Sequence, residues 1–184
     1  MKNKFGIREV VATGICAALV FVLLRFVSIP TPLPDTSFSI HSAVLAFFAV
    51  LFGPIVGFLG GFLGNLLVDV TAGWGIWWSW IVAMGCFGLL TGLGCKGIDL
   101  RSGEFGKKEI IRFNVVQIIS CLISWGVVAP ILDILMYGEP ANKVFMQGIL
   151  SGVSSMIACA IVGTIVCKVY AKSRPKKGSL NKED

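Results

Sequence analysis

Long uncharged runs separated by short polar segments dominate this chain. One run covers about residues 10–24, and a second covers residues 36–68 without any Asp, Glu, Lys or Arg. Further apolar runs cover about residues 75–95, 110–135 and 144–170. A helix rises 1.5 Å per residue, so roughly 20 residues cross a hydrocarbon core about 30 Å thick. The pattern therefore predicts an all-α membrane protein.

The second run is too long for one comfortable crossing. Either it forms two short spans hinged at Phe52, Gly53 and Pro54, or it is one long tilted helix. The basic residues decide between these readings, because positive charge near span ends marks the cytoplasmic side. Of the 16 basic residues, 14 fall into three patches, at residues 2–8, 96–112 and 168–182. Six spans place all three patches on one side, whereas five would export the last two.

We therefore predict a six-transmembrane-helix bundle with both termini cytoplasmic, in the cell membrane. The expected spans are residues 10–27, 37–52, 54–70, 75–95, 110–135 and 144–170. They form one membrane domain, residues 10–170, between a basic cytoplasmic segment, residues 1–9, and a basic tail, residues 171–184, that we expect to be disordered. No cleavable signal peptide is evident, so the first run is expected to stay as the first helix.

Composition agrees with this topology and excludes several classes of protein. The 184 residues are 55% hydrophobic and only 14% charged, whereas soluble domains carry about 25% charged residues. The net charge of +6 sits at the predicted cytoplasmic ends, so no nucleic-acid partner is expected. The six cysteines show no CxxC spacing and are read as packing residues with free thiols. No metal site or cofactor is expected.

Small residues at four-residue spacing predict close helix packing. Glycines recur in this way in the third, fourth and sixth predicted helices, at Gly53, Gly57 and Gly61, Gly60 and Gly64, Gly88 and Gly92, and Gly148 and Gly152. The first helix carries Ala12 with Cys16 and Gly14 with Ala18. On spacing alone, this smooth face serves another membrane protein or the bundle itself.

The stretch NLLVDVTAGWGIWWSW, residues 65–80, joins an amide, a carboxylate, a glycine turn and four tryptophans. Topology places this turn on the outer face. Tryptophans are common at lipid interfaces, but Trp77 and Trp78 point about 100° apart on a helix and cannot both face lipid. Trp74 with Trp78, or Trp77 with Trp80, would share a face. We therefore predict that at least one indole turns inward and that this turn is the mouth of a ligand pocket.

Other polar groups at membrane depth are candidates for the same pocket. Arg25 either snorkels to the headgroups or stands at the cavity rim, and Asp133 lies at a similar outer depth. His41, the single histidine, is either a hydrogen-bonded structural residue or a pocket residue. A stripe of polar residues at steps of four on the last helix, Gln147, Ser151 and Ser155, lines either a cavity or a helix contact. The candidate binding residues are Arg25, His41, Asn65, Asp69, Trp74, Trp77, Trp78, Asp133, Gln147 and Ser151.

Catalytic motifs are missing from the sequence. No P-loop, HExxH or nucleophile elbow occurs, and the outer-side acids are scattered. Enzymatic activity is therefore not expected. A channel is also disfavoured, because polar residues concentrate at the outer end rather than along a continuous line.

Three stretches, RFVSIPTPLPDTSFSI, FFAVLFGPIVGFLGGFLGN and DVTAGWGIWWSWIVA, resemble the S components of energy-coupling factor (ECF) transporters, and are similar to an uncharacterised branch grouped with the riboflavin-type S components. The resemblance covers about residues 7–170. It implies a membrane-embedded subunit that captures a vitamin or related micronutrient outside the cell. It also implies a transmembrane coupling protein and two cytoplasmic ATPases as partners.

The resemblance also implies positions for the functional surfaces. The family pocket maps onto residues 32–41 and 69–78, Asp133 and Gln147. The family docks its coupling protein through small residues of the first helix, which correspond to Ala12, Gly14, Cys16 and Ala18. The substrate stays open between riboflavin and other heterocycles. The alternative hypothesis is a structural or assembly partner in the membrane, surrounded by lipid, that binds no small molecule.

Overall fold

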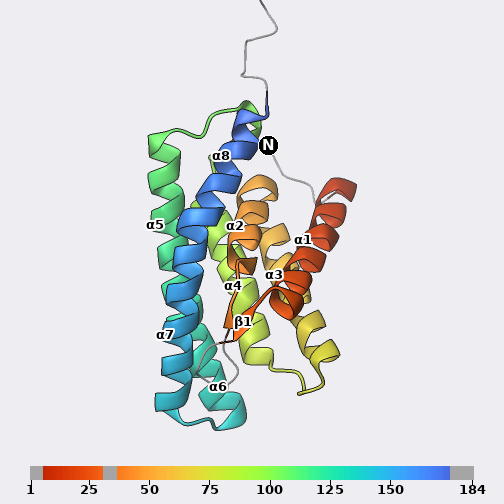
Figure 1. The fold of residues 1–184 in the computed structure, drawn as a ribbon, viewed down its shortest axis with the longest axis vertical. Coiled ribbons are helices and arrows are strands. Elements are labelled where there is room, and N and C mark those ends of the chain that lie inside the picture. Colours follow the sequence, from red (N-terminus) through yellow and green to blue (C-terminus); the bar gives the residue numbers. More distant parts are fainter. Residues whose placement is uncertain (1–5, 31–36, 175–184) are drawn as a thin grey trace, which may run out of the picture.

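The computed structural model describes residues 6–30 and 37–174, and the described chain folds into six helical rods (Figure 1). Four rods are α1 (Ile7–Phe26), α2 (His41–Phe52), α3 (Pro54–Ala72) and α4 (Trp78–Gly94). The fifth continues from α5 (Lys107–Ile123) through the π-helical segment η2 (Ser124–Val128) into α6 (Ala129–Tyr137). The sixth continues from α7 (Ala141–Ala158) through the π-helical segment η3 (Cys159–Gly163) into α8 (Thr164–Lys172). A short 3-10 turn, η1 (Leu100–Ser102), precedes α5.

The six-helix prediction is confirmed, but two helices begin later than expected. Strand β1 (Ile29–Pro30) pairs antiparallel with β2 (Ser37–Phe38), so the chain is still extended where the second span was expected to start. The backbone N–H of His41 then donates to the hydroxyl of Ser39 as α2 begins. Likewise α4 begins at Trp78 rather than residue 75, because Gly73 and Gly75 adopt φ of +82° and +97°, a left-handed backbone that ends a helix.

Four of these rods are long and apolar enough to cross a membrane: α1, α3, and the continuous rods of residues 107–137 and 141–172. Helices α2 and α4 are also apolar but have only 12 and 17 residues. At 1.5 Å per residue, α2 is about 18 Å long and covers little more than half of a hydrocarbon core. The hairpin β1–β2 precedes it, so the chain enters α2 from an extended segment rather than from further helical turns.

The glycine series make α3 the centre of one half of the bundle. A Cβ placed on Gly57 would lie 2.5 Å from the carbonyl oxygen of Gly88, so α3 and α4 touch backbone to backbone. On the other side of α3, a Cβ on Gly60 would lie 2.6 Å from the Sγ atom of Cys16, and one on Gly64 would lie 2.7 Å from Val20. Helices that approach this closely gain the dispersion contacts that drive association in lipid.

Proline explains one of the two π-helical segments. Pro130 has no backbone N–H, so the regular i→i−4 ladder cannot continue through it. Just before it, the N–H of Ala129 donates to the carbonyl of Ser124, five residues back, which is the π-helical pattern. The widened turn brings the Trp125 carbonyl against Gly148 of α7 so closely that a Cβ on Gly148 would overlap it.

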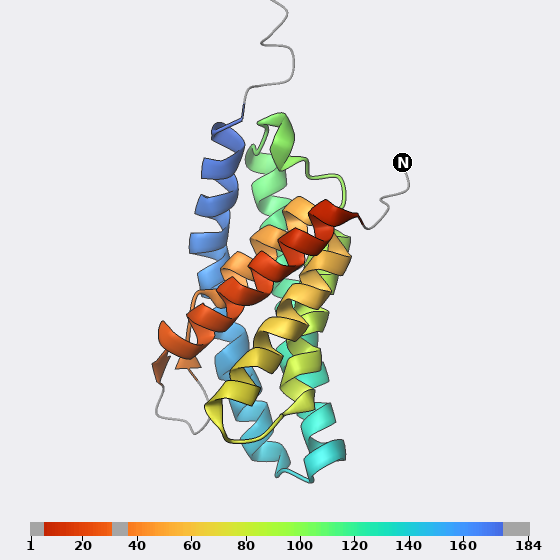
Figure 2. The same ribbon diagram turned by 90° about the vertical axis from the view of Figure 1, so that its right-hand side faces the viewer.

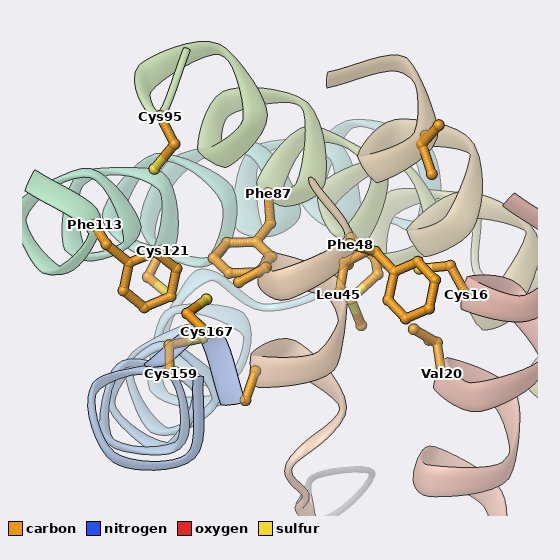
Figure 3. Packing of buried hydrophobic residues seen from close by; sticks show 14 of the residues in the cluster. Cys16, Val20, Leu45, Phe48, Phe87, Cys95, Phe113, Cys121, Cys159 and Cys167 are labelled. Carbon is orange, nitrogen blue, oxygen red and sulfur yellow. The ribbon is translucent and has the colours of Figure 1, made fainter. Parts of the chain in front are cut away.

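The buried core includes the cysteines as small apolar residues. All six thiols are free, and Cys16, Cys95, Cys121, Cys159 and Cys167 are buried. Figure 3 shows Cys121, Cys159 and Cys167 around the rings of Phe87 and Phe113 in the packing between α4, α5, η3 and α8. This arrangement agrees with the reading of the cysteines as packing residues.

The two ends of the bundle differ in character. Helix α1 begins and α8 ends at one end, hereafter the terminal end (Figure 1). The α3–α4 and α6–α7 connections lie together at the opposite end, hereafter the cavity end (Figure 2). Which end faces the cytoplasm stays a prediction from the basic residues.

Candidate ligand-binding site

A cavity of about 500 Å³ opens at the cavity end, between α1, α3, α4, α6 and α7. This volume lies within the range of small-molecule sites, about 300–1,000 Å³. Its walls combine indole rings, amides and charged groups from five helices. The lining residues are Leu24, Arg25, Ser28, Asn65, Val68, Asp69, Trp74, Trp77, Trp80, Asp133, Glu139, Lys143 and Gln147.

Asp69 fixes two of the three tryptophans in the wall. It sits in the last turn of α3 and is only 7% exposed. Its Oδ1 atom accepts a hydrogen bond from Trp74 Nε1 at 3.2 Å, and its Oδ2 atom accepts one from the backbone N–H of Trp77 at 2.9 Å. The left-handed Gly73 turns the chain back so that both donors reach one carboxylate. The carboxylate thus holds the loop against the helix it follows.

Asp133 fixes the third tryptophan from the opposite wall. It is 1% exposed on α6, and its Oδ2 atom accepts a hydrogen bond from Trp80 Nε1 at 2.7 Å. Its Oδ1 atom accepts a hydrogen bond from the hydroxyl of Ser79. The Trp80 ring in turn stacks on Trp125, with ring centroids 5.5 Å apart. The buried carboxylate therefore ties α4 to α6 and orients one indole.

Tyr137 completes the contact between α6 and the α3–α4 loop. Its ring lies 4.5 Å from that of Trp77, centroid to centroid. Its hydroxyl accepts a hydrogen bond from the backbone N–H of Trp78 and donates one to the carbonyl of Ile76. Trp77 is therefore held by Asp69 through its backbone and by Tyr137 through its ring.

The charged groups of the cavity carry both signs. Lys143 and Glu139 form an ion pair, with Nζ 2.9 Å from Oε2. The Arg25 guanidinium lies 6.0 Å from the Phe26 ring centroid, and Asn65 and Gln147 add amide groups. Rigid aromatic walls suit a planar ring, and mixed polar groups suit a ligand with both donors and acceptors. The arrangement thus favours a polar heterocycle.

Seven of the ten candidate residues line this cavity: Arg25, Asn65, Asp69, Trp74, Trp77, Asp133 and Gln147. The structure does not bring the other three to its wall. His41 is buried, and its Nε2 atom pairs with the hydroxyl of Ser42, which bonds that of Ser155 at 2.9 Å. Trp78 packs its ring 6.3 Å from that of Phe62 on the outside of the bundle. Ser151 is half-buried, with its carbonyl accepting from Ser154.

The sequence reasoning missed several lining residues, of which Trp80, Glu139 and Lys143 carry chemistry. Trp80 had a signal, since it shares a helix face with Trp77 three residues earlier. Glu139 and Lys143 had a weaker one, namely an acid and a base four residues apart in a predicted outer loop. Residues 32–36 of the mapped segment 32–41 lie outside the described residues.

The first helix separates the four proposed docking residues into two groups. Ala12 and Cys16 are buried, and Cys16 packs against Gly60 of α3. Gly14 and Ala18 lie on the exposed face of α1, where a Cβ on Gly14 would meet nothing within 4 Å. Of the four residues, only Gly14 and Ala18 are therefore exposed on the surface of the bundle.

Comparison with known proteins agrees with this fold. The sequence matches the family "ECF-type riboflavin transporter, S component" over residues 4–172. A UPF0397 protein of Lactobacillus acidophilus is 51% identical over 179 residues, 97% of each chain. A UPF0397 protein of Lactococcus lactis subsp. cremoris is 49% identical over 183 residues, which is 100% of each chain after rounding.

Solved structures give the same fold. The bundle is similar to ThiT from Listeria monocytogenes, with a TM-score of 0.64 and 18% identity over 91% of this chain and 94% of that one. It is also similar to FolT bound with folic acid, with a TM-score of 0.61 and 16% identity over 88% of this chain and 98% of that one.

The helical bundle is thus that of a membrane-embedded transport subunit. The chain belongs to the S component family of ECF-type transporters. This membership confirms the resemblance drawn from the sequence, and the family is one of substrate-binding membrane subunits.

Proposed function

We propose that this S component captures a vitamin or related heterocyclic micronutrient in the cavity between α1, α3, α4, α6 and α7. The observation that carries the proposal is a wall of three tryptophans that each donate a hydrogen bond to a carboxylate. Trp74 and Trp80 donate from the indole N–H, and Trp77 donates from the backbone N–H. Such preorganised rings bind a planar ligand without a further ordering cost. The likeness to FolT bound with folic acid supports a ligand with a planar ring system.

We further propose that the cavity end faces outside and that both termini are cytoplasmic. The terminal end carries the basic patches of α5 and α8, including Lys107, Lys108 and Lys172, and positive residues mark the cytoplasmic side. A coupling protein and two cytoplasmic ATPases would then drive uptake of the captured ligand. The identity of the substrate has to be determined by experiment.

Native mass spectrometry of the purified protein tests ligand capture. We expect a co-purified small molecule whose retention falls by about 10-fold or more in Trp77→Ala, since stacking on a fixed indole contributes about 1–3 kcal/mol. Trp78→Ala is the matched control, because that indole lies on the outside of the bundle. Equal losses of ligand retention in Trp77→Ala and Trp78→Ala would contradict the assignment of this cavity as the ligand site. If no ligand co-purifies with the wild type, and no nutrient uptake depends on the protein in a screen, the hypothesis of a structural partner would be favoured.

Coupling is tested on the exposed face of α1. We propose that Gly14 and Ala18 contact the coupling protein, so Gly14→Leu and Ala18→Leu are expected to abolish uptake and to preserve ligand binding. The added side chains point away from the bundle and leave its packing unchanged. Ala160→Leu places the same bulk on an exposed position of η3 and is expected to transport normally. Normal uptake by both α1 variants would place the docking face elsewhere.

A further inference from the structure

A second cavity, a groove of about 500 Å³, lies at the terminal end, away from the proposed ligand site. Helix α2 forms its floor, and α1 and α8 flank it (Figure 1). The groove lining consists of Arg8, Val11, Ala12 and Ile15 of α1, Phe47, Phe48, Leu51 and Phe52 of α2, and Tyr170 of α8. One side of the short α2 is exposed here, because α1 and α8 lie beside it and do not pack across it.

The groove is apolar along its length. Val11 and Ile15 are about half exposed, at 54% and 51%. The rings of Phe47 and Tyr170 meet edge to face with centroids 5.4 Å apart, and those of Phe48 and Phe52 stack at 5.7 Å. This surface accepts a flexible hydrocarbon chain without any polar partner.

Three guanidinium groups gather around the aromatic rings at this end. Arg8 and Arg101 lie 5.6 and 5.3 Å from the centroid of the same Phe52 ring. Arg174 lies 4.9 Å from the centroid of the Tyr170 ring and donates to its hydroxyl at 2.9 Å. Like charges held around neighbouring rings repel one another unless an anion lies between them.

Among the described residues, the Glu9 carboxylate attracts Arg8 and Arg101 electrostatically without forming an ion pair with either of them. Within residues 6–30 and 37–174, no carboxylate lies within 4 Å of these three guanidiniums, since the ion pair found there is Lys143–Glu139. The carboxylate of Glu9 accepts instead from the backbone N–H of Gly6 at 3.0 Å. Arg101 donates to the carbonyl of Leu51, while its buried Nε atom has no partner among the described residues.

We propose that the groove binds one anionic phospholipid from the leaflet at the terminal end. One acyl chain lies along Val11, Ile15 and Phe47. The phosphate pairs with Arg8 of the groove lining and with Arg174, which contacts the lining residue Tyr170. Guanidinium groups pair with phosphate through charge-assisted hydrogen bonds. An apolar groove that ends at cations without an ion-pair partner among the described residues matches the chain and headgroup of a lipid. This inference does not depend on the proposed vitamin ligand.

The proposal is tested by native mass spectrometry of the full chain with two lipids of identical acyl chains, dioleoylphosphatidylglycerol and dioleoylphosphatidylcholine. The wild type is expected to retain one phosphatidylglycerol in preference to phosphatidylcholine. In the double variant Arg8→Gln/Arg174→Gln, retention of phosphatidylglycerol is expected to fall about 10-fold, because two of the cations near the phosphate are lost. Retention of phosphatidylcholine should not change.

The double variant Lys107→Gln/Lys108→Gln is the matched control, since it removes the same charge from exposed positions of α5 at the same end. It is expected to keep the preference for phosphatidylglycerol. A third variant, Ile15→Trp, fills the groove from an exposed position and is expected to reduce retention of this lipid. Equal retention of both lipids by the wild type, or equal losses in the two double variants, would overturn the lipid site. The groove would then be left to a protein partner.

Discussion

Gly88→Leu is expected to prevent the bundle from assembling correctly. Any Cβ on Gly88 would overlap the carbonyl of Gly57 and lie 3.0 Å from its Cα atom, so the clash is between backbones. Backbone cannot rotate away as the end of a side chain can, and α3 would have to move from α4. Overpacking of a well-packed core costs about 1–3 kcal/mol, and we expect a clash between two backbones to cost more. We expect the apparent Tm in detergent to fall by about 10 °C or more.

The control for this prediction is the same substitution at another helical glycine. Gly14→Leu adds equal volume on the exposed face of α1, where nothing lies within 4 Å of the new Cβ. Its Tm is expected to stay within a few degrees of the wild type. If Gly88→Leu unfolds at the wild-type temperature, the close α3–α4 contact does not set the stability of the bundle.

The second large effect is expected from one chemical change made at two carboxylates. Asp69→Asn should weaken ligand binding by about 10- to 100-fold, while Asp133→Asn should bind nearly as the wild type does. Asp69 accepts from the Trp74 indole N–H and the Trp77 backbone N–H, and both of these groups can only donate. An amide has one acceptor oxygen, so Asn at this position leaves one donor unpaired and its tryptophan free to move.

Asp133 differs because one of its partners is a hydroxyl. An Asn there can accept from Trp80 Nε1 with its oxygen and donate its NH₂ to the oxygen of Ser79, which turns its proton elsewhere. Isothermal titration with the identified ligand measures both variants. A leucine at this position can neither accept from Trp80 Nε1 nor donate to Ser79. Asp133→Leu is therefore the positive control for loss of both hydrogen bonds. Equal losses in the two Asn variants would mean that negative charge, rather than orientation of the indoles, determines affinity.

The tryptophan cluster shows how far residue patterns lead toward the site. Helical spacing predicted that Trp77 and Trp78 face different ways, and in the structure Trp77 lines the cavity while Trp78 packs outside. The spacing could not say which of the two turns inward. That choice depends on the Asp69 bond to the Trp77 backbone and on the contact with Tyr137, a residue 60 positions further along the chain.

His41 and the α1 residues show where patterns stop. A single histidine near the outer end fits a pocket or a structural role equally well by sequence. The structure pairs it with Ser42 and, through that hydroxyl, with Ser155 of α7. Similarly, the four-residue spacing of small residues exists on two faces of α1. Contact with Gly60 buries the Cys16 face and leaves the Gly14 face exposed.

The sequence by itself determined the number of helices, their approximate limits and the segment that forms the cavity mouth. These follow from properties that act locally: apolar length against membrane thickness, proline and glycine breaks, and clustered charge. The tertiary structure alone decided which side chains meet. Rotation of each helix about its axis is set by glycine contacts such as Gly57 with Gly88 and by bonds such as Trp80 with Asp133, and these join residues distant in the chain.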